Sequence, residues 1–233
     1  MADLLEDRTL YDKAYEGDVA YVKAAIEAVP EGPERRKFLN KRDSDGRSLM
    51  HWAASGGHGD LIEMLLRCEA RVDSRDEARW TPLISAASAG RVAIVQQLLA
   101  AGADANADTD DGRIALHYHK GNTALLEVLL PVTADVDQRD AGGSTALHRA
   151  AGPGLVEAMR ALLGAGAKAG RQDKRGNTPL HFACEEGREQ AALLLVDNGA
   201  RLDVKNSEKQ TPLDLAPPEL AATLVAAARE AAG

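Results

Sequence analysis

The chain has 233 residues, of which 45% are hydrophobic and only 3% aromatic, so its core must be packed mainly by Leu, Ala and Val. Its formal net charge of −8 argues against a nucleic-acid-binding protein, which needs a basic face to neutralise phosphates. No apolar run reaches the roughly 18 residues of a membrane span, and the acidic start, Met1 to Asp7, lacks the pattern of a secretory signal. We therefore expect a protein of the cytoplasm and nucleus that binds neither nucleic acid nor membranes.

Residues 1–42 predict a degenerate capping repeat followed by a loop. Leu10 to Ile26, with Gly17 seven residues after Leu10, look like an atypical first copy of a repeat that recurs further along the chain. Terminal repeats of an array need altered, more polar outer faces. The stretch from Pro30 to Lys37 lengthens the join to the next repeat by seven residues relative to the later period. We expect this charged stretch to form a solvated loop.

Residues 43–210 repeat one six-residue phrase five times, and a truncated sixth copy follows. The phrases begin at Ser48, Thr81, Ile114, Thr145 and Thr178, and the sixth begins at Thr211. Their starts lie 33, 33, 31, 33 and 33 residues apart. Self-similarity at this period around a T-P-L-H-x-A core is the signature of the ankyrin repeat. The sequence therefore predicts an all-α ankyrin-repeat solenoid, a single domain over residues 1–233 with about seven repeats of helix-turn-helix plus β-hairpin fingers.

Each repeat places its turn and helix residues at fixed positions. An Asp or Asn lies five residues before the phrase, at Asp43, Asp76, Asp140, Asp173 and Asn206. At that position its side chain can bond the backbone of a finger turn. The Thr or Ser of the phrase can cap the first helix through its hydroxyl, and Pro82, Pro179 and Pro212 fall at the first helical position. The first helix of each repeat should therefore begin at the phrase.

The fourth repeat departs from this regularity. Leu116 and Leu130 are 14 residues apart rather than the usual 16, and His119 replaces the Ala expected two residues after the His of the phrase. We predict a shortened first helix or turn, and a second helix disturbed at its end by Pro131. Residues 211–233 complete the array as a C-terminal capping repeat, with Pro217 to Val225 as its second helix.

Four histidines occupy the same place in successive repeats: His51, His117, His148 and His181. Metal ligands must converge on one point, whereas these side chains are spaced by about one repeat. We interpret them as structural, with each ring bonding the backbone of a neighbouring finger. Cys68 and Cys184 lie in different repeats and are interpreted as reduced and structural. Because no constellation of Ser, His and Asp predicts catalysis, we expect no enzyme activity, no metal and no cofactor.

An open array has no closed pocket, so a protein partner is expected on the fingertips and on the exposed face of the first helices. In successive repeats, the position after the His of the phrase holds Trp52, Tyr118, Arg149 and Phe182. The position before the phrase holds Arg47, Trp80 and Arg113. Large side chains at these places offer much contact area. For the aromatic residues, contact with a partner and packing between neighbouring fingers are both open.

Charge divides along the array. Residues 1–111 hold 21 acidic and 14 basic residues, whereas residues 112–233 hold 15 and 14. The expected groove carries Asp45, Glu77, Asp110 and Asp111 on its earlier fingers, and Lys120, Arg149, Lys174 and Arg175 on its later ones. Such polarity would orient a partner with the opposite charge pattern. Ordinary solvated charge on the fingertips is the alternative.

Several stretches resemble the gankyrin family, the seven-repeat ankyrin subunits associated with the proteasome regulatory particle: Gly46 to His58, Trp80 to Arg91, Leu116 to Tyr118, and Gly176 to Glu186. The resemblance implies an assembly chaperone of the proteasome base that binds the C-terminal domain of one ATPase subunit. By position it implies these contact residues: Tyr15, Asp45, Arg47, Trp52, Glu77, Trp80, Arg113, Tyr118 and Lys120. We expect the protein to be a monomer.

One motif of that family is altered here. Its Leu-x-Cys-x-Glu motif, linked to retinoblastoma-protein binding, corresponds to a stretch from Phe182 to Glu186 in which Phe replaces Leu. We therefore do not carry that activity over. The competing function is that of a generic ankyrin adaptor or kinase-inhibitor-like regulator with an unrelated protein partner, although kinase inhibitors of this fold are usually shorter arrays.

Overall fold

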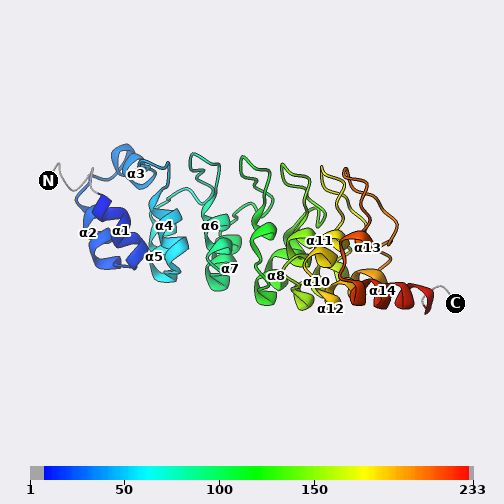
Figure 1. Cartoon of the computed structure of the whole chain (residues 1–233). Helices are drawn as coiled ribbons and strands as arrows, with labels where there is room; N and C mark the ends of the chain where they lie inside the picture. Colours follow the sequence, from blue (N-terminus) through cyan, green and yellow to red (C-terminus); the bar gives the residue numbers. More distant parts are fainter. Residues whose placement is uncertain (1–7, 231–233) are drawn as a thin grey trace. The chain divides into compact units, whose positions relative to one another are not determined.

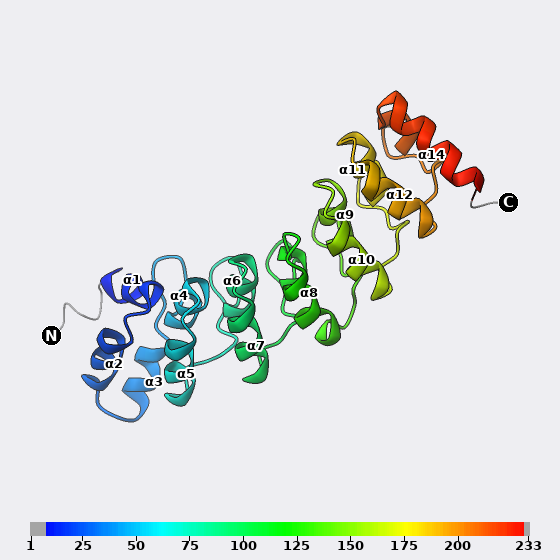
Figure 2. The same cartoon turned by 90° about the horizontal axis from the view of Figure 1, so that it is seen from below.

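A computed structural model describes residues 8–230, which fold into successive pairs of short helices joined by extended fingers (Figures 1 and 2). The chain divides into two compact units, Met1–Asp110 and Asp111–Gly233, called here the N-terminal and the C-terminal unit. The first seven residues, in which the sequence shows no secretory pattern, lie outside the described part, as do residues 231–233.

The N-terminal unit contains three helix pairs and one additional helix. The pairs are α1 (Arg8–Glu16) with α2 (Val19–Glu27), α4 (Leu49–Gly56) with α5 (Gly59–Arg67), and α6 (Pro82–Ser88) with α7 (Val92–Ala100). Helix α4 packs against both α1 and α6, so the first helices of neighbouring pairs form one layer. Leu61, Leu65 and Leu98 from the second helices are fully buried. Leucine and alanine therefore supply most of the core, as the composition predicts.

The loop expected at residues 30–37 is confined to residues 30–32, because helix α3 (Pro33–Leu39) begins within this stretch. Pro33 occupies the first helical position, where a missing backbone N–H carries no penalty. The Arg35 guanidinium donates from Nε and Nη2 to the carbonyl of Val29, at 3.0 and 2.8 Å. Phe38 and Leu39 at the end of the helix are buried. Their burial stabilises a helix that the charged residues before them do not suggest.

The C-terminal unit begins with the shortened fourth repeat. Its first element is a four-residue 3₁₀ helix, η2 (Ala115–Tyr118), and its second is α8 (Thr123–Leu129), capped by the Asn122 side chain. Helix α8 ends in a 3₁₀ turn, η3 (Leu130–Val132), that contains Pro131. The prediction of a short first helix and a disturbed end to the second is confirmed.

The rest of the C-terminal unit is more regular. It contains α9 (Ala146–Ala151) with α10 (Val156–Gly164), α11 (Pro179–Glu185) with α12 (Glu189–Asp197), and α13 (Pro212–Leu215) with α14 (Pro218–Glu230). Helix α11 packs against α9 and α13, which again places the first helices in one layer. Leu162, Leu195 and Leu224 of the second helices are fully buried.

The fingers are built around the Asp or Asn that the sequence places five residues before each phrase. Asp43 Oδ1 accepts hydrogen bonds from the backbone N–H groups of Asp45 and Arg47, at 2.9 and 2.8 Å. Successive fingers are joined at their tips by a backbone hydrogen bond, such as Glu77 N–H to the Asp45 carbonyl at 3.2 Å. Residues 8–230 contain no β-strand, so the predicted hairpin fingers are turns without a ladder.

The repeated histidine caps its own helix and bonds the next finger. His51 Nδ1 accepts from the Ser48 backbone N–H at 3.1 Å, which leaves the ring hydrogen on Nε2, and Nε2 donates to the Trp80 carbonyl at 2.9 Å. His148 and His181 do the same towards the carbonyls of Asn177 and Gln210. Burial lowers the pKa of each of these rings. The predicted structural use of this position is confirmed at these three histidines.

Candidate protein-binding surface

The structure leaves all fifteen predicted contact residues at least partly accessible. Eight are exposed: Tyr15, Asp45, Glu77, Asp110, Asp111, Lys120, Lys174 and Arg175. Seven are half-buried: Arg47, Trp52, Trp80, Arg113, Tyr118, Arg149 and Phe182. Their arrangement differs between the two compact units.

In the N-terminal unit, three of the predicted residues, Tyr15, Trp52 and Arg47, contact one another in a row, called here the aromatic row. The rings of Tyr15 and Trp52 meet edge to face, with centroids 6.0 Å apart and planes at 88°. The Arg47 guanidinium carbon lies 5.2 Å from the Trp52 ring centroid, a cation–π contact, and its Nε lies 3.5 Å from Asp76 Oδ2. Tyr15 is 48% exposed. The row presents aromatic area on side chains that are already fixed in place.

Trp52 is fixed by Asp43, which the sequence pattern predicts only as a turn residue. Its indole Nε1 donates to Asp43 Oδ2 at 2.7 Å. Beside it lies a cleft of about 660 Å³, and its lining includes Arg8, Tyr11, Asp45 and Trp52. Burial and the charge of Asp43 raise the pKa of Tyr11 to about 12. Sequence reasoning missed Arg8 and Tyr11 because they precede the regular repeats.

The remaining predicted residues of this unit lie on successive fingertips. Glu77 bonds the finger of Asp45 through its backbone, and Asp110 bonds the Ala78 carbonyl in the same way at 3.1 Å. Trp80 is half-buried, and its backbone N–H donates to Asp76 Oδ1 at 2.8 Å. Asp110 is exposed but lies 3.9 Å from the Arg79 guanidinium, so part of its charge is already balanced.

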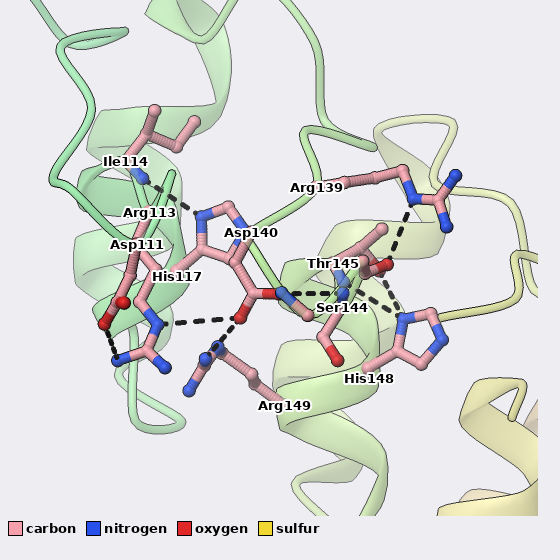
Figure 3. A network of polar contacts seen from close by, with 12 residues as sticks. Asp111, Arg113, Ile114, His117, Arg139, Asp140, Ser144, Thr145, His148 and Arg149 are labelled. Atoms are coloured by element: carbon pink, nitrogen blue, oxygen red, sulfur yellow. Dashed lines mark hydrogen bonds and ion pairs between the residues drawn. The ribbon is translucent and has the colours of Figure 1, made fainter. Parts of the chain in front are cut away.

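In the C-terminal unit, two arginines converge on the carboxylate of Asp140 (Figure 3). Arg149 Nη2 lies 2.6 Å from Asp140 Oδ2, and Arg113 Nε lies 3.5 Å from the same oxygen. Arg113 also approaches Asp111 at 3.6 Å. The side chain of Asp140 is only 5% exposed. Arg149, expected as a free positive charge of the later fingers, is therefore largely committed to its own repeat.

His117 lies beside this ion-pair group and differs from the other repeated histidines. Its Nδ1 caps η2 by accepting from the Ile114 N–H at 3.2 Å. Its Nε2 is buried and has no hydrogen-bond partner among residues 8–230. Burial and the charge of Arg149 lower the pKa of His117 to about 4. The prediction that each repeated histidine bonds a neighbouring finger is wrong here, although the Ser144 and Gln138 backbones lie close enough to the ring to oppose the lowering of its pKa.

Three other predicted residues of this unit gather at one place. Lys174, Arg175 and Phe182 line a cleft of about 390 Å³, whereas Lys120 lies outside it, in a left-handed turn with φ of 46°. The Phe182 ring meets the His148 ring edge to face at 5.9 Å. Tyr118 ends η2 and shares a side-chain hydrogen bond with Arg113.

A profile described as ankyrin repeats in three copies matches four overlapping stretches of this sequence: residues 10–109, 94–173, 114–206 and 150–226. The chain is an ankyrin-repeat protein. The solved ankyrin-repeat domain of human ASB11 is 27% identical to it, with a TM-score of 0.81, covering 95% of this chain and 98% of that one. Ankyrin repeats act as protein–protein interaction scaffolds, so these surfaces belong to a protein-binding scaffold of a typically non-enzymatic class.

Two sequence relatives show how widely this ankyrin repeat is shared. Ankyrin repeat and KH domain-containing protein mask-1 of Caenorhabditis elegans is 33% identical over 128 residues, which is 53% of this chain and 5% of that protein. Human 26S proteasome non-ATPase regulatory subunit 10 is 39% identical over 69 residues, 30% of this chain and 28% of that protein. The chain thus spans under a third of the length of either relative.

The described residues also include the side chains that metal ions and disulfides would use. Within residues 8–230, no three His, Cys, Asp or Glu side chains group as metal ligands would. Cys68 is half-buried and Cys184 buried, both are free thiols, and burial raises the pKa of the Cys184 thiol to about 12. No helix between residues 8 and 230 has the length and apolar character needed to cross a membrane.

Proposed function

We propose that this ankyrin-repeat protein is an assembly chaperone of the base of the proteasome regulatory particle, acting in the cytoplasm and nucleus. In this proposal it binds the C-terminal domain of one ATPase subunit as a monomer, without catalysis. The observation that carries the proposal is the 39% identity over 69 residues with 26S proteasome non-ATPase regulatory subunit 10. The family resemblance of the sequence around Arg47, Trp52 and Trp80 points the same way.

The contacts within the N-terminal unit suit this role. Trp52 is held by Asp43, and Arg47 by Asp76 and the Trp52 ring, so these side chains lose little conformational freedom when a partner binds. Half-buried Trp and Arg side chains are the types that contribute most to protein interfaces. A scaffold with such side chains can hold a folded domain, and its bulk then blocks the neighbouring subunit until assembly proceeds.

Affinity purification of the tagged chain from a native lysate, followed by mass spectrometry, tests the proposal. Recovery of one base ATPase subunit together with few other proteasome subunits is expected. Recovery of kinases or of unrelated proteins without base ATPases would instead assign the chain to the generic adaptors or kinase-inhibitor-like regulators.

Variants in the N-terminal unit test the surface itself. Glu77→Lys changes an exposed fingertip, and Asp60→Lys is the matched control because Asp60 is exposed on α5, the second helix of its pair. Trp80→Ala and Arg47→Glu complete the set, with circular dichroism to verify folding. Loss of the ATPase subunit with Glu77→Lys and Trp80→Ala, but not with Asp60→Lys, is expected. Equal recovery with all four folded variants would reject this surface.

A further inference from the structure

Two fingers of the C-terminal unit have the same turn but different surroundings. Asp140 Oδ1 accepts from the backbone N–H groups of Gly142 and Ser144, both at 2.9 Å. Asp173 Oδ1 accepts from those of Arg175 and Asn177, at 2.8 and 2.9 Å. In each finger one carboxylate oxygen therefore holds the turn, and the other oxygen, Oδ2, is left for a second role.

At Asp140, the second oxygen is occupied by cations from the chain itself. Arg149, the residue after the phrase His, places Nη2 at 2.6 Å from Oδ2, and Arg113, the residue before the preceding phrase, places Nε at 3.5 Å (Figure 3). The contact of Arg149 is a charge-assisted hydrogen bond, which is among the stronger kinds in proteins, and that of Arg113 is an ion pair. The finger of Asp140 thus shows how a guanidinium group fits against this turn.

At Asp173, both arginine positions hold residues that cannot supply a cation. Phe182 stands where the previous repeat has Arg149, and Ser144 stands where it has Arg113. No side chain within residues 8–230 donates to Asp173 Oδ2. The cleft of about 390 Å³ opens here, and Ser144, Asp173 and Phe182 are part of its lining. A cleft therefore lies beside Asp173, whereas two guanidinium groups lie beside Asp140.

We infer that this cleft binds an arginine side chain of a partner protein, with the guanidinium on Asp173 Oδ2 and beside the Phe182 ring. Glu185 and Glu208 also line the cleft, so its three acids outnumber the two bases, Lys174 and Arg175. Arginine fits better than lysine because its planar fork can bond a carboxylate and stack on an aromatic ring together. The inference rests on the protein-binding role of the repeats and not on the identity of the proposed proteasome partner.

Titration of the full ¹⁵N-labelled chain with acetyl-arginine amide tests the site without any partner protein. Saturable shifts are expected at the amides of Arg175 and Asn177, because both bond the Asp173 carboxylate. Acetyl-citrulline amide has nearly the same shape but no charge, and it is expected to cause no saturable shift. Binding of both compounds alike, or no saturable shift at these amides, would overturn the inference.

Another finger of the chain shows that Asn can replace Asp at this turn position without loss of the turn. Asn206 holds the next finger by accepting from the N–H groups of Glu208 and Gln210, at 3.0 and 2.9 Å. Asp173→Asn should therefore keep its turn while losing the charge. It is expected to weaken binding of acetyl-arginine amide by about tenfold or more, since a hydrogen bond to a charged group contributes on the order of 1.5–3 kcal/mol. Undiminished binding by Asp173→Asn would contradict the site.

Two further variants separate the site from general charge effects. Phe182→Arg places an arginine where Arg149 stands in the previous repeat, and it is expected to occupy Asp173 and weaken binding of the probe to a similar degree. Glu127→Gln removes an exposed acid on α8, outside the cleft, and is expected to bind as the unaltered chain does. Equal weakening by Glu127→Gln would mean that the affinity for acetyl-arginine amide depends on the net charge of the protein and not on this cleft, and would reject the inference.

Discussion

Within the C-terminal unit, two contacts between a repeat and the next finger, called here the first and the second join, use the same finger turn but different side-chain bonds. In the first join, residues 111–118 meet the finger of Asp140, and in the second, residues 142–148 meet the finger of Asp173. His148 bonds the Asn177 carbonyl at 3.2 Å in the second join, whereas His117 Nε2 bonds nothing in the described part of the first. The fourth repeat, two residues shorter than its neighbours, thus keeps the helix cap made by this histidine but lacks the histidine's hydrogen bond to the next finger.

Other side chains supply the connection that His117 lost. His119 Nε2 bonds the Ala146 carbonyl at 3.2 Å, and its Nδ1 accepts from the Gly121 N–H at 3.0 Å. Arg113 reaches across to Asp140. The comparison teaches that a repeat can lose part of its framework when neighbouring positions provide equivalent bonds. In the second join His148 itself bonds the next finger, and no side chain within residues 8–230 donates to Asp173 Oδ2.

The largest expected effect is a difference between two alanine substitutions. His148→Ala removes a cap, an inter-finger hydrogen bond and a buried ring, and should lower the free energy of unfolding by about 2–4 kcal/mol. His117→Ala also removes a cap and a buried ring but relieves an unsatisfied Nε2–H, so a smaller loss of about 1–2 kcal/mol is expected. Urea unfolding at pH 7 measures both. Equal losses would show that the two joins do not differ as described.

Acid pH should affect the first join through His117. Its folded pKa of about 4 lies below the ordinary value near 6.5, so the unfolded chain binds the proton more readily. The stability it contributes is present above about pH 6.5 and is lost as the pH falls towards 4, which amounts to about 2 kcal/mol between pH 7 and pH 5.

Comparison with His117→Ala isolates this contribution. The other buried histidines with lowered pKa values act in the same direction and remain in the variant. The variant should therefore lose about 2 kcal/mol less than the unaltered chain when both are unfolded in urea at pH 7 and at pH 5. An identical pH dependence in the two chains would mean that His117 does not titrate as its burial suggests.

A glycine pair tests how tightly each join is packed. Gly112 and Gly143 occupy the same turn position with φ of 70° and 82°, so Ala in either should cost about 1–2 kcal/mol from the left-handed conformation alone. A Cβ on Gly143 would lie 2.8 Å from the Lys174 backbone nitrogen, whereas on Gly112 its nearest neighbour would be 3.4 Å away. Gly143→Ala should therefore be less stable than Gly112→Ala by about a further 1 kcal/mol in thermal or urea unfolding. The reverse order would refute the tighter second join.

Much of the fold follows from the sequence because each repeat is specified locally. The spacing of the phrases predicts where most first helices begin. The sequence alone also predicts the Asp of each finger, the Thr that caps each first helix and the shortened fourth repeat. Helix α3 was missed because no repeat aligns with residues 33–39, and only the burial of Phe38 and Leu39 distinguishes that helix from a charged loop.

The side-chain pairs of the candidate surface were harder to predict. Trp52 lies nine residues after Asp43, and Arg149 nine residues after Asp140. Only the structure shows that this spacing places the side chain of the first helix within hydrogen-bonding distance of the finger of its own repeat. With that geometry known, Phe182, nine residues after Asp173, marks a carboxylate whose Oδ2 receives no hydrogen bond from a side chain within residues 8–230. The exposure of the predicted contact residues could be anticipated, whereas the commitment of Arg149 to Asp140 could not.

The smallest expected effect concerns the open oxygen of Asp173. Phe182→Arg loses the ring contact with His148, so its net effect on stability mixes two changes. Measuring Phe182→Arg in the unaltered chain and in Asp173→Asn removes the lost ring contact by subtraction and leaves the coupling between positions 173 and 182. A partly exposed ion pair should give a coupling of about 0.5 kcal/mol in urea unfolding, decreasing at high salt. A coupling indistinguishable from zero would mean that a guanidinium at position 182 does not reach Asp173 as Arg149 reaches Asp140, and the second join would differ from the first in more than its side chains.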